Sequence, residues 1–305
     1  MEEYISDNSL YIRSKNNSMI NRKMIGRVLG MLLFIELGMF LLCAGVSAGY
    51  GESDYKYFLY TCIINAVVGG LLLLYGRGAE NKMSRRDGYC VVTLSWVFFT
   101  FFGMLPFYFS GSIDTITNAF FETMSGFTTT GATILDDIES LSHGMLFWRS
   151  LTQWIGGLGI VFFTIAILPI FTTGGVQLFS AESTGVTHDR THPKINVMAK
   201  WLWTIYLVLT VSETVLLMFG GMSLFDAICQ SFATTATGGY STKQNSISYW
   251  NSPYIEYVVA IFMIISSINF SLFLMCLKGK VGRLFKDEET HWFLGSVGIL
   301  TLLIT

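Results

Sequence analysis

Length, composition and charge argue against a water-soluble globule and against nucleic-acid binding. Of the 305 residues, 52% are hydrophobic and only 13% are charged, which is about half the charged fraction of a typical soluble domain. The net charge of -2 provides no basic surface, so a nucleic-acid partner has no electrostatic support.

Apolar runs separated by short charged segments predict an integral membrane protein made of α-helices. The polar stretch Met1–Lys23 precedes the first run, and no small-residue cleavage site follows it, so it does not resemble a removable signal peptide. The predicted spans are Met24–Ala48, Tyr57–Tyr75, Tyr89–Phe109, Phe147–Phe171, Lys200–Gly221 and Tyr254–Leu277. A seventh run, His291–Thr305, is too short to cross at about 1.5 Å per residue. We therefore expect the chain to stop inside a helix.

The distribution of lysine and arginine predicts which loops face the cytoplasm, because short cytoplasmic loops hold the positive excess. The residues on this predicted side are Arg13, Lys15, Arg22, Lys23, Arg27, Arg77, Lys82, Arg85, Arg86, Arg190, Lys194, Lys200, Lys278, Lys280, Arg283 and Lys286. The opposite side has only Lys56, Arg149 and Lys243, together with the acids Glu52, Asp54, Asp136, Asp137 and Glu139. This asymmetry predicts a cytoplasmic N-terminus.

Two external segments, each too short to cross the membrane, form an internal repeat. Residues 114–133 read DTITNAFFETMSGFTTTGAT, and residues 225–242 read FDAICQSFATTATGGYST. Without a gap, Ala119 matches Ala227 and Gly131 matches Gly239. The repeated unit is a span, a half-helix, a Thr/Gly strand and a second span.

The chemistry of these segments favours a cation filter. We expect each half-helix to begin with a capping oxygen, from Asp114 or Asn118 in the first and from Asp226 in the second. Its C-terminal end carries partial negative charge, and non-helical backbone at membrane depth is tolerated where it lines water. Glycine lets carbonyls turn toward one axis, where they can replace the water shell of an ion. The alternative is a pair of ordinary external loops, but two loops in register favour a filter.

The predicted filter residues are Thr129, Thr130, Gly131 and Ala132, called here the first Thr/Gly segment, and Thr237, Gly238, Gly239 and Tyr240, the second Thr/Gly segment. We expect both segments to be extended and to face one another.

With these segments in view, the sequence resembles the Trk/Ktr/HKT superfamily of potassium transporters, and within it the bacterial TrkH-type subunit. The matching stretches are AFFETMSGFTTTGAT at 119–133, WRSLTQWIGGLGI at 148–160, QLFSAE at 177–182 and ATGGYS at 236–241. The likeness extends over nearly the whole chain. It also links glycine at Gly131 to potassium preference and serine there to sodium permeation.

The resemblance implies an all-α integral membrane fold, with an N-terminal helix pair followed by four span–re-entrant pore loop–span repeats around a pseudo-fourfold pore. This chain would hold the pair, two complete repeats and a truncated third. The implied division is 1–88 for the cytoplasmic N-terminus and helix hairpin, 89–171 for the first repeat, 172–199 for a cytoplasmic linker, 200–277 for the second repeat, and 278–305 for a loop and the start of the third. A pore needs a closed ring of ligands and this chain would supply half of one, so the resemblance implies a fragment of a longer subunit.

The implied function is potassium transport, as the channel-like subunit of a Trk-type uptake system in the bacterial inner membrane. The implied ligand is potassium at the filter residues, without an organic cofactor. The implied partners are a second copy of the subunit and a cytosolic nucleotide-binding regulatory subunit. We expect no enzymatic activity, since the sequence offers neither a nucleophile–base pair nor a metal set at credible membrane depth.

Several residues carry both a functional and a structural interpretation. Glu36 and Glu213 lie inside apolar runs, where a carboxyl group suggests function, although helix contacts would also explain them. An ion-coupled secondary transporter is therefore the alternative function, with one of these acids binding the coupling ion at a midplane site and with paired helix interruptions. Glu122 could add negative potential near the ion or bind neighbouring backbone, and Arg149 could pair with an external acid or with pore-loop carbonyls.

The remaining candidates favour structural roles. Gly156, Gly157 and Gly159 form a small face suited to close helix packing. His188 and His192 have a spacing that could bind a metal on a helix, but Pro193 disfavours helix there and favours a solvated loop. The cysteines form no C-x-x-C pair and lie in or beside apolar runs, which is typical of buried thiols: Cys43, Cys62, Cys90, Cys229 and Cys276.

Overall fold

The protein is described here from a computed structural model that covers residues 20–79, 84–159, 194–277, 282 and 287–304. Its helices are α2 (Arg22–Gly49), α3 (Tyr55–Tyr75), α4 (Arg85–Gly103), α5 (Leu105–Ser110), α6 (Ile116–Phe127), α7 (His143–Gly157), α10 (Lys194–Phe219), α11 (Leu224–Thr235), η1 (Ser246–Trp250), α12 (Pro253–Ser267), α13 (Phe270–Leu277) and α14 (Glu288–Ile304). Within these residues the regular structure is all helical, as predicted.

Four helical stretches are long and apolar enough to cross a membrane: Arg22–Gly49, Tyr55–Tyr75, Arg86–Ser110 and Lys200–Phe219. Each coincides with a predicted span. Pro253–Ser267 is apolar but shorter, and the second half of the predicted span Phe147–Phe171 lies outside the described residues. The linker motif at 177–182 and the two histidines His188 and His192 also lie outside them.

Two of the predicted spans are interrupted. The third breaks at Met104 between α4 and α5, two residues before Pro106. Proline has no N–H to donate, and its ring crowds the carbonyl four residues earlier, so a straight helix cannot pass through it. The sixth breaks at Ile268, whose extended backbone separates α12 from α13.

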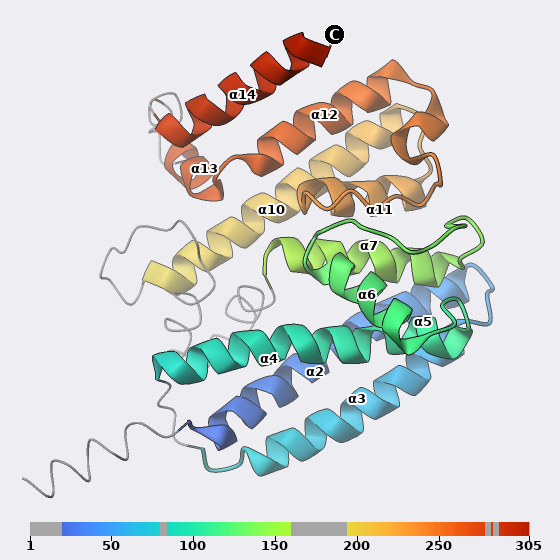
Figure 1. The fold of residues 1–305 in the computed structure, drawn as a ribbon, viewed down its shortest axis with the longest axis vertical. Helices are drawn as coiled ribbons and strands as arrows, with labels where there is room; N and C mark the ends of the chain where they lie inside the picture. Colours follow the sequence, from blue (N-terminus) through green and yellow to red (C-terminus); the bar gives the residue numbers. More distant parts are fainter. Residues whose placement is uncertain (1–19, 80–83, 160–193, 278–281, 283–286, 305) are drawn as a thin grey trace, which may run out of the picture.

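The helices form two successive groups that meet at α7 (Figure 1). Helix α2 packs on α3, α4 and α7, while α10 packs on α11, α12 and α13. Helix α7 contacts α2 and α6 in the first group and α11 in the second. The two short helices α6 and α11 therefore both pack against α7.

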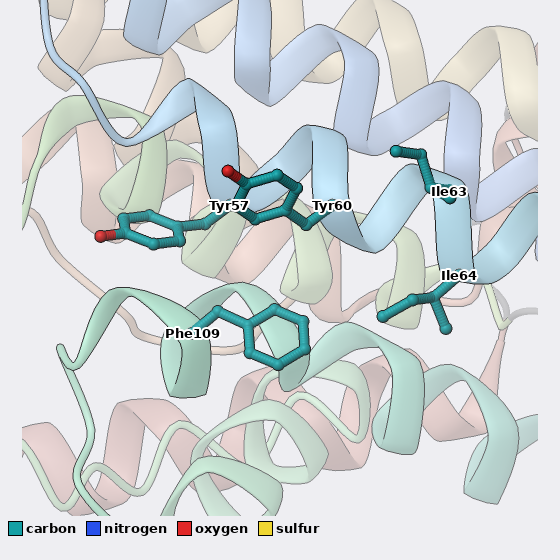
Figure 2. A pocket seen from close by; sticks show the side chains of 5 residues that line it. All are labelled: Tyr57, Tyr60, Ile63, Ile64 and Phe109. Atoms are coloured by element: carbon teal, nitrogen blue, oxygen red, sulfur yellow. The ribbon is translucent and has the colours of Figure 1, made fainter.

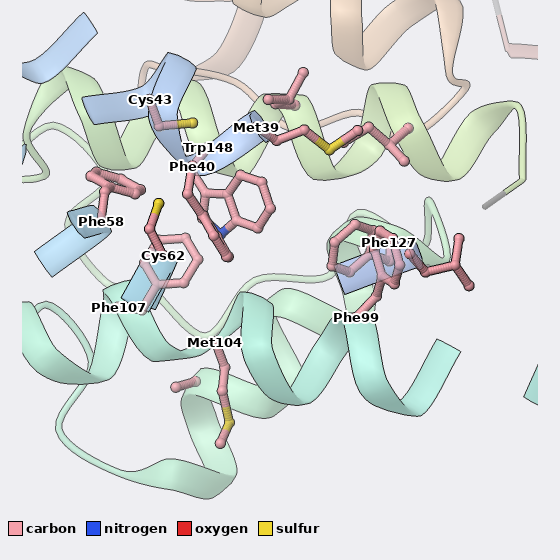
Figure 3. Close-up of a cluster of buried hydrophobic side chains, with 14 of the residues drawn as sticks. Met39, Phe40, Cys43, Phe58, Cys62, Phe99, Met104, Phe107, Phe127 and Trp148 are labelled. Atoms are coloured by element: carbon pink, nitrogen blue, oxygen red, sulfur yellow. The ribbon is translucent and has the colours of Figure 1, made fainter. Parts of the chain in front are cut away.

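Aromatic side chains fill the core of the first group (Figure 3). Trp148 of α7 is fully buried, its ring centroid lies 4.6 Å from that of Phe40, and its indole N–H donates to the Gly103 carbonyl at 2.8 Å. Phe127, at the end of α6, contacts both Trp148 and Phe99 edge to face. Helix α7 is thus attached to the N-terminal helices through rings as well as through a hydrogen bond.

Glycines on α7 allow both short helices to approach it closely, which confirms the predicted packing role of Gly156 and Gly157. A Cβ on Gly156 would collide with the Phe127 carbonyl at the end of α6. A Cβ on Gly157 would lie 2.7 Å from the Cα of Ala236, just after α11. The ends of both short helices consequently rest on one face of α7.

Replacing Gly156 with alanine tests this packing. Gly156→Ala should lower the free energy of unfolding by about 1–3 kcal/mol, because the obstructing atom belongs to backbone and cannot rotate away. Gly38→Ala is the matched control, since Gly38 also lies within a helix but a Cβ there meets nothing within 4 Å. Thermal unfolding of detergent-purified protein measures the difference. Equal unfolding midpoints for both variants would contradict the close approach.

Candidate functional site

The two short helices begin with hydroxyl caps rather than with the predicted acids and amides. The Thr115 hydroxyl accepts from the Asn118 N–H at 3.2 Å, and the Ser223 hydroxyl accepts from the Asp226 N–H at 3.1 Å. The prediction that Asp114 or Asn118 caps α6 was therefore wrong. Asp226 lies in the first turn of α11 and accepts hydrogen bonds from the hydroxyls of Ser223 and Thr242.

The two short helices end in the same way, in the register predicted from the sequence. The Thr129 N–H donates to Gly126 and the Thr130 N–H to Ser125, at 3.0 and 2.9 Å. At the matching positions the Thr237 N–H donates to Thr234 and the Gly238 N–H to Ala233, at 2.9 and 2.8 Å. This pair of bonds is the Schellman motif, which normally requires a left-handed residue just after the helix.

Threonine occupies that left-handed position in both segments. The φ angles are 53° at Thr129 and 55° at Thr237, followed two residues later by 75° at Gly131 and 87° at Gly239. Positive φ is rare for a β-branched residue, and such backbone costs on the order of 1–3 kcal/mol. Strain of this kind is concentrated at functional sites, and here it recurs at matched positions of a repeat.

The two Thr/Gly segments are non-helical, and they touch. They are not the extended strands predicted from the sequence, because two residues in each have positive φ. A Cβ added to Gly131 would collide with the carbonyl oxygen of Gly238. The side chains of Thr130 and Thr237 are exposed, and a Cβ on Gly239 would meet no atom of the described residues within 4 Å. The structure therefore brings the predicted residues together and leaves one side of the pair open.

Two of the predicted filter residues are also bound from behind. The Ala132 carbonyl accepts hydrogen bonds from the hydroxyls of Ser125 and Tyr240, at 2.6 and 3.2 Å. The side chain of Tyr240 is buried, and its hydroxyl also contacts the carbonyl of Glu122 at 2.9 Å. Ala132 and Tyr240 thus connect the open face of the segments to the protein behind it.

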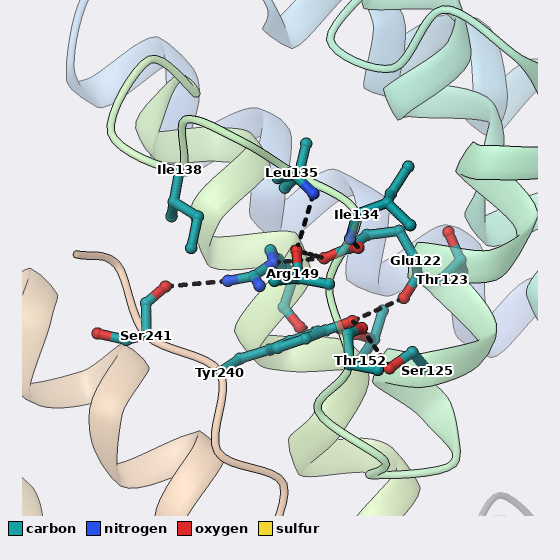
Figure 4. A network of polar contacts seen from close by, with 12 residues as sticks. Glu122, Thr123, Ser125, Ile134, Leu135, Ile138, Arg149, Thr152, Tyr240 and Ser241 are labelled. Carbon is teal, nitrogen blue, oxygen red and sulfur yellow. Dashed lines mark hydrogen bonds and ion pairs between the residues drawn. The ribbon is translucent and has the colours of Figure 1, made fainter. Parts of the chain in front are cut away.

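A buried ion pair joins the first short helix to the loop after the second (Figure 4). Arg149 donates from Nε to the Glu122 carboxylate at 2.8 Å and from a terminal nitrogen to the Ser241 carbonyl at 2.9 Å. Its guanidinium also lies 3.6 Å from the ring centroid of Tyr240. The side chains of Arg149 and Glu122 are only 3% and 1% exposed, so this charge pair is sealed from solvent.

Glu122 directs the chain after the first Thr/Gly segment. Its carboxylate accepts the Ile134 N–H and the Thr133 hydroxyl, both at 3.0 Å, in addition to Arg149. This agrees with the interpretation that Glu122 binds backbone behind the segment. Both interpretations predicted for Arg149 bear on its contacts: it binds a backbone carbonyl, that of Ser241, and it pairs with an acid, Glu122 of α6.

Glu36 and Glu213 are fully buried but lie behind the short helices. Glu36 accepts from the Asn65 amide at 3.0 Å, and a Cβ on Gly103 would lie 3.2 Å from it. Glu213 accepts from the Thr235 hydroxyl at 3.5 Å, near the end of α11. Each has one carboxylate oxygen without a partner among the described residues.

Hydrogen bonds around Glu52 join the loop after α2 to the start of α7. Partial burial alone would raise the pKa of Glu52, but hydrogen bonds from the backbone and ring of His143 and from the Gly144 N–H outweigh it, so the pKa is lowered. The His143 ring also stacks on Tyr50 at 3.9 Å. The loop after α2 is thereby attached to the start of α7.

A shallow apolar groove lies apart from this site, between α3 and α5 (Figure 2). Its lining consists of Tyr57, Tyr60, Ile63, Ile64 and Phe109. None of the residues of the Thr/Gly segments lines it. Its lining side chains carry no charge, and their only polar atoms are the hydroxyls of the two tyrosines.

Breaking the buried pair should cost far more than breaking an exposed one. Glu122→Gln removes the counter-charge of a sealed guanidinium, which should lower the free energy of unfolding by about 3–5 kcal/mol. The control is Glu139→Gln, which breaks the more exposed Lys243–Glu139 pair at 3.4 Å and should cost less than about 1 kcal/mol. Thermal unfolding in detergent compares the two. Similar small losses would show that Arg149 is not buried against Glu122.

With this geometry established, comparison with known proteins identifies relatives. The family model TrkH, described as "Cation transport protein", matches residues 55–304. The Trk system potassium uptake protein TrkH of Escherichia coli K12 is 40% identical over 284 residues, covering 92% of this chain and 59% of that protein. The TrkH of Halomonas elongata is 36% identical over 285 residues, with the same coverage of the two chains.

A solved structure has the same fold. The crystal structure of the potassium transporter TrkH from Vibrio parahaemolyticus matches with a TM-score of 0.80 and 33% identity, covering 93% of this chain and 58% of that one. The chain thus spans about three-fifths of the length of the relatives it matches. The predicted family and the predicted membrane fold with pore-loop repeats are confirmed, and the chain belongs to the TrkH family of cation transport proteins.

Proposed function

We propose that this chain forms part of the channel-like translocating subunit of a Trk-type potassium-uptake system. The observation that carries the proposal is the matched pair of strained helix ends, with left-handed Thr129 and Thr237 at equivalent positions and Gly131 against Gly238. The printed names of the relatives, which are potassium uptake proteins, support potassium as the ion carried.

The physical argument concerns how backbone oxygens can hold a dehydrated cation. The C-terminal ends of α6 and α11 bring partial negative charge to the segments that follow them. Carbonyl oxygens of residues 129–131 and 237–239 would replace part of the water shell of potassium. Ala132 and Tyr240 would hold these oxygens in place from the opposite side. The Ala132 carbonyl already accepts hydrogen bonds from two hydroxyl groups.

Two segments would supply half of a fourfold ring. The chain covers 59% of its Escherichia coli relative, and a ring of ligands must close around the ion to conduct selectively. We therefore assign conduction to a subunit completed with the third and fourth repeats that the family resemblance implies. The proposed division of this chain is a hairpin region at 1–88, repeats at 89–171 and 200–277, a linker at 172–199 and a further segment at 278–305.

The proposal extends to location and partners. The Lys/Arg distribution supports a multi-pass protein of the bacterial inner membrane with a cytoplasmic N-terminus. The names of the relatives refer to a Trk system, which supports assembly with other components. We propose that these components are a second copy of the subunit and a cytosolic nucleotide-binding regulatory subunit, which docks on the inner loops.

An ion-coupled secondary transporter remains the second candidate, because one observation favours it. Helix α7 ends at Gly157 and α12 at Ser267, close to matching positions of the repeat, and a break at Ile268 separates α12 from α13. The acids that this mechanism would use are elsewhere, since Glu36 binds Asn65 and Glu213 binds Thr235 behind the short helices. This separation favours the channel-like mechanism.

Selectivity should respond to side chains at the two matched glycines. Gly131→Ser should lower the preference for potassium over sodium, because its Cβ displaces the Gly238 carbonyl and its φ of 75° strains any side chain. Gly239→Ser should act in the same direction, by straining a φ of 87°. The test is growth of a potassium-uptake-deficient bacterium on limiting potassium, with rubidium and sodium fluxes measured in the completed subunit.

Gly221→Ser is the matched control for that experiment. Gly221 also has positive φ, 93°, with open space at its Cβ, but it lies in the turn after α10. Its substitution should leave selectivity unchanged. Unchanged selectivity in both Thr/Gly variants at normal protein amounts would require the filter assignment to be withdrawn.

Sidedness can be measured by cysteine labelling in intact cells. Asp137→Cys should react with a membrane-impermeant thiol reagent, and Lys82→Cys should not, because the charge distribution assigns these positions to opposite faces. Labelling of the unmodified chain gives the background, and three of its five cysteines are buried. Reaction at position 82 would reverse the proposed topology.

A further inference from the structure

The side chain of Gln153 lies between the two Thr/Gly segments. It projects from α7 one turn after Arg149 and is fully buried. Its Oε1 accepts the backbone N–H of Tyr240 at 3.1 Å. It is therefore a direct contact of the second Thr/Gly segment, made by a helix that belongs to the first repeat.

The other half of the carboxamide lies beside the contact between the segments. A Cβ on Gly238 would lie 2.7 Å from Nε2 of Gln153, and a Cβ on Gly131 would lie 3.8 Å from the same nitrogen. Glycine at position 238 is thus required for the backbone to rest on the carboxamide. One side chain reaches both segments at the point where they touch.

The nitrogen of this carboxamide has no hydrogen-bond partner in the part of the chain that the structure describes. A buried N–H group without an acceptor is costly, so such a group normally has an acceptor within reach. The groups beside it are peptide units of the two Thr/Gly segments. Their carbonyl oxygens are acceptors whenever they turn away from an ion.

We propose that Gln153 is a positioning residue that sets ion selectivity by holding the two Thr/Gly segments in register. Oε1 fixes the second segment through Tyr240, and Nε2 supplies the donor that a carbonyl at the Gly131–Gly238 contact needs when it rotates off the ion axis. This inference rests on the proposed filter. It adds a side chain that limits how far the carbonyls can move, and therefore how small an ion they can hold.

The geometry requires a side chain of this length that carries both an acceptor and a donor. Asparagine would carry the same amide one methylene shorter and would withdraw it from both segments. Glutamate would keep an acceptor for Tyr240 but would lose the donor. Methionine would preserve the volume and lose both the acceptor and the donor, so the three substitutions separate the two functions of the amide.

The experiment measures the ratio of rubidium to sodium uptake in the completed subunit, alongside protein amount and unfolding midpoint. Gln153→Met should lower the ratio by about tenfold, the size expected for the loss of one buried hydrogen bond. Gln153→Glu should lower it less, because the contact with Tyr240 is kept. The control is Gln230→Met in α11, which replaces another buried glutamine that contacts Thr234 and should leave the ratio unchanged.

A purely structural role predicts a different pattern. Gln153→Met would then lower the unfolding midpoint while the ratio stayed at its original value, and this result would overturn the proposal. If the methionine variant does not accumulate, Gln153→Asn gives the answer, since a normal ratio with the shortened amide would be equally decisive. Gly131→Ser in the same assay distinguishes this inference from the filter proposal. If Gly131→Ser changes the ratio and the Gln153 variants do not, only the role of Gln153 is rejected. If neither Gly131→Ser nor Gly239→Ser changes the ratio, the filter itself is rejected.

Discussion

The buried guanidinium of Arg149 is the group on which the arrangement of both Thr/Gly segments depends. A charge removed from water must be paired and hydrogen-bonded where it lies. Arg149 meets this requirement with the Glu122 carboxylate, the Ser241 carbonyl and the face of Tyr240. These partners come from α6 and from the loop after α11, so satisfying one charge places segments of two different repeats side by side.

The same face of α7 carries three kinds of contact in succession. Arg149, Gln153 and the pair Gly156 and Gly157 follow at intervals of four, three and one residues, which places them on one side of a helix. Arg149 supplies a charge, Gln153 an amide, and the glycines a surface without side chains. The ends of α6 and α11 rest at the glycines, and the segments that follow them pass Gln153 and Arg149. One helix face thus determines both how closely the repeats approach and how their backbones are held.

The features that could be predicted from the sequence have local signals. Apolar runs marked the spans, and the ungapped repeat marked the two short helices whose ends have the same hydrogen bonds. The caps were mispredicted because hydroxyl, carboxyl and amide side chains can all occupy an N-cap position. Composition does not decide whether Thr115 and Ser223 or the nearby acids and amides occupy it. Gln153 was missed because its partner Tyr240 is 87 residues away. Its position four residues after Arg149 was the available signal, and it becomes informative only once the segment facing α7 is known.

The two copies of the repeat share a backbone conformation but differ in their packing. Thr129 and Thr237 share one strained conformation, so the two helix ends present their following peptides in the same way. Yet Gly131 rests on the Gly238 carbonyl, whereas a Cβ on the matching Gly239 would meet no atom of the described residues within 4 Å. The Gly238 carbonyl is pressed against the first segment, so it can rotate less than a carbonyl beside a gap. In the proposed filter, an ion that requires closer approach of the oxygens would strain this contact, so discrimination between ions would depend on the side where Gly131, Gly238 and Gln153 lie.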